Sequence, residues 1–196
     1  MLSGGGIMND AYLDPKAGEV LRIMFQEDAL VPSVQLQKFL SDEEFKKVSD
    51  TIKKEWFKKE IVPASHSFGR AEVSSIVLKI LFSDETKKVI ERIIGRKIKN
   101  VLEEAFSFEQ GDYTIIHDEK NDEGTYFIFS INDDWEYSNG GSTIVVDGTG
   151  EFRNISAPGN TLTIVDIKKD VHLFHKYVNH HAETRKLYVV KGRIED

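Results

Sequence analysis

The chain has 196 residues, of which 40% are hydrophobic and 30% charged, a balance typical of one globular domain. The absence of cysteine excludes disulfide frameworks, thiolate metal sites and a cysteine nucleophile, and it leaves His, Asp and Glu as the candidate metal ligands. The net charge of −7 argues against direct binding of nucleic acid, and no apolar run is long enough to span a membrane.

Residues 1–30 are predicted to form a flexible leader followed by a short helix. The stretch from Met1 to Asn9 is rich in glycine and has neither a basic n-region nor an apolar h-region, so it does not resemble a signal peptide. We therefore expect a cytoplasmic protein. Lys16 to Phe25 carries an amphipathic pattern, and residues 31–196 are expected to form a single domain.

Two helices are predicted in the first half of this domain. Ser41 precedes three acidic residues, which is a helix N-cap signal, and apolar residues then recur at helical spacing over about 41–59. Ser83 begins a second helix over about 84–95, which Gly95 ends. An extended segment is predicted over 33–39, a loop over 63–70 and a strand over 73–82.

After Gly95 the pattern changes to short runs of β-branched and aromatic residues separated by turn clusters. The predicted strands cover 98–108, 113–116, 125–132, 142–147, 151–155, 161–167, 174–178 and 185–190. Strands at this spacing indicate a sandwich or barrel over about 97–193, and helices that come first indicate packing outside a β core.

The most informative segment is the apolar strand that ends in His117 and Glu119. In a strand, residues two apart point to the same face, so these two side chains project together. Two histidines and one carboxylate form a triad suited to Fe(II), and the third ligand must come from another strand. A His-x-Glu pair alone is a weak signal, because solvated polar residues at a strand end give the same pattern.

The order of the motifs downstream resembles that of the 2-oxoglutarate- and Fe(II)-dependent dioxygenases of the prolyl hydroxylase type. The shared features are an apolar strand that ends near Trp135, the Gly140–Gly141 pair, a Pro158–Asn160 turn, a distal histidine and a final arginine. The run from Gln110 to Glu119 looks especially like the ribosomal-protein prolyl hydroxylase subgroup. The resemblance covers about Leu36 to Arg193 and implies a double-stranded β-helix (jelly-roll, cupin-like) core packed by the N-terminal helices.

The same resemblance implies the roles of individual residues. His117, Glu119 and His175 would ligate iron, and His172 is the second choice for the distal ligand. Arg185, ten residues after His175, would hold the distal carboxylate of 2-oxoglutarate with its planar guanidinium. Tyr113, four residues before the first ligand, would donate its hydroxyl to the same carboxylate. No catalytic residue beyond the metal ligands is implied.

The implied activity is hydroxylation of a C–H bond with Fe(II), 2-oxoglutarate and O2, with ascorbate as an additional reductant. The implied substrate is a prolyl residue of a protein or peptide, which the subgroup suggests is ribosomal. Glu119 departs from the Asp that is usual in the family, and its extra methylene moves the carboxylate outward by roughly one bond length. Two alternatives therefore stay open: a non-catalytic module that binds a metal or an acid, and a hydroxylase of small molecules. The sequence leaves the oligomeric state open.

Overall fold

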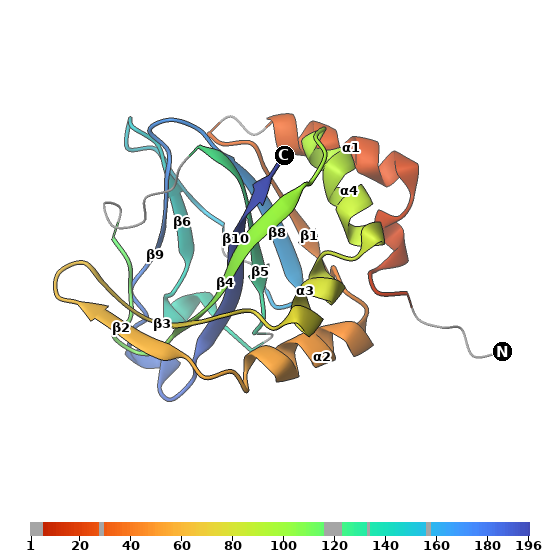
Figure 1. The fold of residues 1–196 in the computed structure, drawn as a ribbon. Helices are drawn as coiled ribbons and strands as arrows, with labels where there is room; N and C mark the ends of the chain where they lie inside the picture. The colour runs from red at the N-terminus through yellow and green to blue at the C-terminus, as the bar shows by residue number, and fades with distance from the viewer. Residues whose placement is uncertain (1–5, 28–29, 116–122, 133, 156–157) are drawn as a thin grey trace.

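The computed structural model describes residues 6–27, 30–115, 123–132, 134–155 and 158–196. Within these residues, two β-sheets face each other and four α-helices pack against the outer side of the larger sheet (Figure 1). The larger sheet has the strand order β1-β8-β5-β10-β4-β3-β2, and the smaller has the order β7-β6-β9. The helices are α1 (Pro15–Glu27), α2 (Asp42–Ile52), α3 (Ser75–Leu81) and α4 (Asp84–Ile94), with 3-10 turns η1 (Asp10–Tyr12), η2 (Tyr137–Asn139) and η3 (His180–Ala182).

The strands of the larger sheet are β1 (Ser33–Gln37), β2 (Lys58–Val62), β3 (His66–Ala71), β4 (Asn100–Phe108), β5 (Gly124–Ser130), β8 (Thr161–Ile167) and β10 (Leu187–Glu195). Those of the smaller sheet are β6 (Thr143–Val146), β7 (Phe152–Asn154) and β9 (His172–His175). Neighbouring strands pair antiparallel throughout both sheets. This arrangement confirms the predicted mainly-β architecture with helices packed outside the β core.

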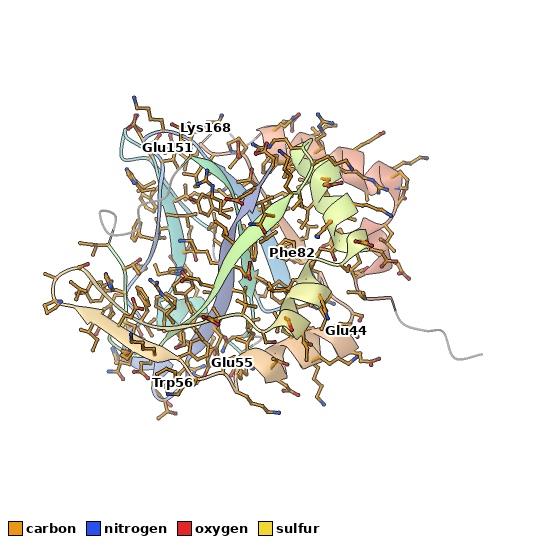
Figure 2. The ribbon with its side chains drawn as sticks, viewed as in Figure 1. Glu44, Glu55, Trp56, Phe82, Glu151 and Lys168 are labelled. Atoms are coloured by element: carbon orange, nitrogen blue, oxygen red, sulfur yellow. The ribbon has the colours of Figure 1, made fainter. Side chains whose placement is uncertain are left out.

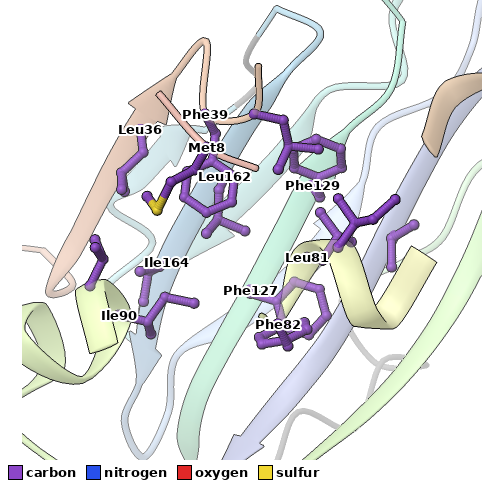
Figure 3. Close-up of a cluster of buried hydrophobic side chains, with 14 of the residues drawn as sticks. Met8, Leu36, Phe39, Leu81, Phe82, Ile90, Phe127, Phe129, Leu162 and Ile164 are labelled. Atoms are coloured by element: carbon purple, nitrogen blue, oxygen red, sulfur yellow. The ribbon is translucent and has the colours of Figure 1, made fainter. Parts of the chain in front are cut away.

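The larger sheet is buried on both faces, and each face has its own apolar cluster. On β5, Phe127 and Phe129 point to the helices, and Figure 3 shows them in the cluster that also holds Leu81 and Ile90. Tyr126 and Ile128 point the other way, into the space between the sheets. Because both faces are covered, β5 has a nearly continuous apolar sequence rather than a strict alternation.

The helix predicted over 41–59 is correct at its start and too long at its end. The Ser41 hydroxyl accepts the N-cap hydrogen bond from the Glu44 backbone, as expected, but α2 ends at Ile52. The chain then forms a β2–β3 hairpin where a loop was expected over 63–70. Trp56, which lies within the predicted helical range four residues after Ile52, is 79% exposed, and Figure 2 shows it at the edge of the molecule. Pairing of β3 with β4 outweighs the local helical pattern here.

The strand predicted over 73–82 is wrong, because this segment forms helix α3. A short apolar run rich in β-branched residues fits either structure, and its flanking residues did not separate the two. In the helix, Val77, Ile80 and Leu81 fall on one buried face. That spacing indicates a helix, which is the correct structure, whereas the β-branched residue types favoured a strand.

Other elements follow the prediction closely. Helix α4 begins after Ser83, whose hydroxyl accepts from the Thr86 backbone, and ends at Gly95, which has a φ of 73°. The amphipathic piece around Lys16 to Phe25 is helix α1, and β8 has the predicted bounds. The expected strand over 174–178 is displaced, since β9 covers His172–His175, and the last strand, β10, extends to Glu195.

Candidate functional site

A cavity of about 650 Å³ lies between the two sheets, a volume suited to a small-molecule or peptide side-chain site. Its walls come mainly from the inner face of β3, β4, β5 and β10, and His175 at the end of β9 contributes from the smaller sheet. Aromatic rings and charged side chains share this lining, among them Phe68, Phe106, Phe108, Tyr126, His66, Arg70, Glu104, Lys191 and Arg193.

His175 is the innermost polar side chain of the described lining, with 2% of its surface exposed. Its imidazole lies 4.5 Å, centroid to centroid, from the Phe108 ring, and its Nδ1 atom is 3.3 Å from the Thr143 hydroxyl. Thr143 and His175 are register partners in the β6–β9 pair, so the strand pairing itself brings the hydroxyl to the ring. These contacts fix the orientation of a buried imidazole that faces the cavity.

Thr114 ties the segment before the predicted His-x-Glu ligands to His175. The His175 backbone N–H donates to the Thr114 hydroxyl at 2.7 Å, and the Thr114 N–H donates to the His175 carbonyl at 3.0 Å. Both residues line the cavity. Thr114, three positions before His117 and five before Glu119, is thus hydrogen-bonded to the predicted distal ligand.

A buried carboxylate anchors the same segment two residues earlier. Asp112 is 2% exposed, and its oxygens accept from Lys59 Nζ at 2.6 and 2.7 Å and from the Ser67 hydroxyl at 2.6 Å. The Glu109 backbone N–H also donates to Asp112, at 2.9 Å. This network joins the segment to the β2–β3 hairpin, because Lys59 lies on β2 and Ser67 lies on β3. A buried carboxylate is stable when it is paired and hydrogen-bonded in this way.

The surrounding charges shift two ionisation equilibria in this network. Partial burial alone would lower the pKa of Lys59, but its hydrogen bonds to Asp112 and Glu109 outweigh that effect and raise the pKa. Hydrogen bonds from Lys59 and Lys186 lower the pKa of Glu109. In the cavity lining, burial raises the pKa of Glu103. The ion pairs of Lys59 with Asp112 and Glu109 therefore favour the charged forms of Lys59 and Glu109.

Of the three predicted metal ligands, only His175 belongs to the described residues. His117 and Glu119 lie outside the described residues, so the triad stays a prediction. His175 faces the cavity, whereas the second choice, His172, belongs to the more exposed set on β9, which alternates with the buried Leu173 and His175. His172 therefore points to the opposite face of the small sheet from His175. Across the described part of the chain, no group of three or more His, Asp or Glu residues is arranged to hold a metal.

Arg185 is not among the residues that line the cavity that contains His175. Its Nη2 donates to the His181 carbonyl at 2.7 Å and to Asn139 Oδ1 at 3.2 Å. Its Nε lies 3.3 Å from the Ala182 carbonyl, and its Nη1 lies 3.4 Å from the Asp134 carbonyl. The guanidinium thus ties η3 to the loop around η2, and the cosubstrate role of Arg185 stays a prediction.

Tyr113 is half-buried and pairs through its backbone with Ser67 of β3. Among the described residues of this segment that line the cavity, the hydroxyl comes from Thr114 rather than from Tyr113. Tyr113 itself is not among the residues that line the cavity. Its cosubstrate role also stays a prediction.

Three cations line the cavity that were not predicted from the sequence: Arg70, Lys191 and Arg193. Arg70 lies over the rings of Phe68 and Phe106, at 5.6 and 6.0 Å from their centroids, and pairs with Glu104 at 3.3 Å. Lys191 is the register partner of Glu104, and Arg193 that of Tyr126. The signal that could have found the two on β10 is the alternation by two from the buried Leu187 and Val189.

Solved structures with the same fold include several oxygenases. A prolyl hydroxylase from Trichoplax adhaerens, in complex with a hypoxia inducible factor peptide fragment, has a TM-score of 0.73 at 12% identity over 92% of this chain and 90% of its own. A prolyl-4-hydroxylase from Pseudomonas putida has a TM-score of 0.68 at 10% identity, covering 90% and 98%. The alpha-ketoglutarate-dependent epimerase of nogalamycin biosynthesis has a TM-score of 0.69 at 12% identity, covering 93% and 84%.

These likenesses confirm the double-stranded β-helix, or jelly-roll, core that the motif order implied. No protein-family model matches the sequence, and no curated protein is a significant match to it. Identities of 12% and below show a shared fold. Within the described residues, every helix is too short or too polar to cross a membrane.

Proposed function

We propose that this chain is an Fe(II)- and 2-oxoglutarate-dependent oxygenase that hydroxylates a C–H bond, and that its substrate is a prolyl residue of a protein. The observation that carries the proposal is the burial of His175 in a cavity between the two sheets of a jelly roll. Solved prolyl hydroxylases share this fold, and the motif order of the sequence assigns His175 independently as the distal ligand.

His117, Glu119 and His175 would hold the iron. The position of His175 supports this proposal, because its imidazole faces the cavity and is oriented by the Thr143 hydroxyl. Imidazole is a ligand type that suits iron. Bound iron and 2-oxoglutarate would supply the oxidising chemistry. The chain itself would position the metal through the Thr114–His175 hydrogen bonds and would exclude water with the Phe68, Phe106 and Phe108 rings.

A prolyl substrate is proposed from the resemblance in sequence and from two neighbours in fold. The Trichoplax adhaerens protein is described as a prolyl hydroxylase in complex with a peptide fragment, and the Pseudomonas putida protein as a prolyl-4-hydroxylase. A ribosomal protein is the finer proposal, and it rests on the run from Gln110 to Glu119 alone. When the chain is incubated in air with Fe(II), 2-oxoglutarate and ribosomal proteins, mass spectrometry should show a proline-containing peptide that has gained the mass of one oxygen atom.

Anaerobic titration with Fe(II) and 2-oxoglutarate tests the activity itself. The wild-type chain should develop a weak visible charge-transfer band and should release succinate when air is admitted. His175→Ala should abolish both signals, whereas His172→Ala, on the same strand but pointing to the other face, should retain them. Absence of the band and of succinate in the wild type would contradict the proposal. Loss of both signals in His172→Ala but not in His175→Ala would reassign the distal ligand.

Two observations favour a second candidate, a metal- or acid-binding module without turnover. The Arg185 guanidinium is hydrogen-bonded to nearby backbone carbonyls and to Asn139. The proposed triad has Glu119 where Asp is usual in the family that the sequence resembles. Glu119→Asp separates the two candidates. If the wild type binds iron but does not consume 2-oxoglutarate, and the Asp variant does, the chain is a binding module that descends from an oxygenase.

A further inference from the structure

We infer that the outer face of helix α1 is a docking surface for a second copy of this chain, paired antiparallel about a two-fold axis. The surface consists of Lys16, Val20, Ile23, Met24 and Glu27, all of which are exposed. The exposed fractions of Val20, Ile23 and Met24 are 55%, 52% and 54%. None of these residues takes part in the proposed oxygenase site, so the inference goes beyond that function.

The two sides of α1 have different partners within the fold. Gly18 and Phe25 are buried, and the β and δ carbons of Arg92 on α4 lie 3.8 and 3.4 Å from the position that a Cβ at Gly18 would occupy. This side therefore holds α1 against the rest of the molecule. Val20 and Ile23 are each displaced by about half a turn from a buried residue two positions away, so they point outward. Figure 1 shows α1 at the periphery of the helical layer.

The spacing of the outer residues is that of a helix-packing stripe. Val20, Ile23, Met24 and Glu27 recur at intervals of three and four, which places them on one face of a helix. A surface helix of a monomer normally turns such an apolar stripe to its own core. Here the core contact is already made by the opposite side, so the stripe is available to a partner.

The charges at the ends of the stripe identify that partner as a second copy. Antiparallel pairing centred between Leu21 and Arg22 places Val20 opposite Ile23 of the second copy. The same pairing places Lys16 opposite Glu27 of the second copy at both ends of the contact. Within the described residues, neither Lys16 nor Glu27 forms a side-chain ion pair. A two-fold interface requires this kind of self-complementarity.

The contact is small, so the dimer should be weak. One helix face buries less than the roughly 1,200 Å² of a stable interface, and exposed ion pairs add little affinity. Sedimentation velocity from low micromolar to near-millimolar concentration should therefore show a monomer that passes reversibly into a dimer. A wild-type chain that stays monomeric throughout this range would overturn the inference.

Ile23→Glu should weaken the dimer by about tenfold or more, because it places a charged carboxylate opposite Val20 in the apolar centre of the contact. Ile76→Glu is the matched control, since Ile76 is a 60% exposed isoleucine on α3, away from the stripe. Circular dichroism should show both variants folded. Equal dimerisation of Ile23→Glu and wild type, or an equal loss in Ile76→Glu, would contradict the assignment of the surface.

A charge-swap experiment tests the antiparallel register. Lys16→Glu alone and Glu27→Lys alone should each dimerise several-fold more weakly than wild type, because each places like charges opposite each other at both ends. An equimolar mixture of the two variants should regain the wild-type affinity as a heterodimer, since every facing pair is then opposite in charge. Failure of the mixture to recover would overturn the antiparallel register. Neither result depends on whether the chain binds iron.

Discussion

At the residue scale, the placement of His175 depends on its neighbours as much as on its own strand. Its backbone is held by the Thr114 hydroxyl and its ring by Thr143 and Phe108. A histidine on β9 is predictable from a motif, but these three contacts come from segments 32 to 67 positions away in the chain. They turn a histidine in a sequence into an oriented group in a cavity.

Thr114→Val should destabilise the fold, because it removes the acceptor of the buried His175 N–H. Leaving a buried donor unpaired costs about 1–3 kcal/mol of the free energy of unfolding, which urea denaturation would measure. Thr114→Ser keeps the hydroxyl and should lose less than half of that amount. A larger loss in Thr114→Ser than in Thr114→Val would show that packing of the Thr114 methyl, rather than its hydrogen bond, supports His175.

Arg185→Ala should also lower the free energy of unfolding, by about 2 kcal/mol, since it releases η3 from the loop around η2. Lysine cannot make the same fork of hydrogen bonds, so Arg185→Lys should not restore the stability. Calorimetric titration of the same variants with 2-oxoglutarate tests the predicted cosubstrate role. Affinity that is unchanged in Arg185→Ala but reduced in Lys191→Ala would move that role to the cavity lining.

At the element scale, the helix caps were read correctly because they are local. A capping side chain lies within three residues of the amide that it binds, so the signal and the structure share one stretch of sequence. Ser41 and Ser83 both accept the expected backbone hydrogen bond. Assignment of the segment over 73–82 failed because its apolar run has no equally strong local signal.

Ser83→Ala should destabilise the protein by about 1 kcal/mol through loss of the α4 N-cap. Ser74, the N-cap residue of α3, makes no side-chain capping hydrogen bond and is the matched control. Thermal unfolding should therefore show a lower midpoint for Ser83→Ala and a smaller change for Ser74→Ala. The reverse order would mean that the cap geometry of α4 contributes nothing measurable.

The ion pair that joins Glu109 to Lys59 of the β2–β3 hairpin makes the free energy of unfolding depend on pH. The pKa of Glu109 is lowered in the fold by hydrogen bonds from Lys59 and Lys186, so the folded state holds the carboxylate more strongly than the unfolded chain does. The stabilisation is present above the unfolded pKa of about 4.3 and is lost as pH falls through the lower folded pKa. Glu109→Gln should therefore flatten the acid limb of stability against pH in urea titrations. An unchanged acid limb would show that the ion pairs of Glu109 do not contribute to the stability of the fold.

At the scale of the whole molecule, Gly192 on β10 allows the close approach of the neighbouring strands β4 and β5 in the larger sheet. A Cβ at Gly192 would meet the Leu102 carbonyl of β4 and would lie 2.6 Å from Cε1 of Phe127 on β5. Since two neighbouring strands would have to move, Gly192→Ala should lower the free energy of unfolding by about 1–3 kcal/mol or more. Gly148→Ala, where the nearest atom is 3.3 Å away on the Asp170 side chain, is the control and should fold normally. Similar urea midpoints would contradict this packing account.

The sequence by itself determined the β-rich second half and the caps of α2 and α4. Each of these depends on periodicity or on contacts within a few residues, which the chain order records directly. Glycine at the end of α4 belongs to the same class, because a left-handed residue is required there whatever packs around it.

Only the tertiary structure decided the β2–β3 hairpin, the cations in the cavity lining and the hydrogen bonds that the Arg185 guanidinium makes. These features depend on which distant segment lies opposite. Lys58 to Val62 become a strand because β3 is held by β4, and Arg185 turns to the η2 loop because carbonyls are presented there. Long-range partners are chosen by the free energy of the whole fold, so a short sequence window cannot fix them.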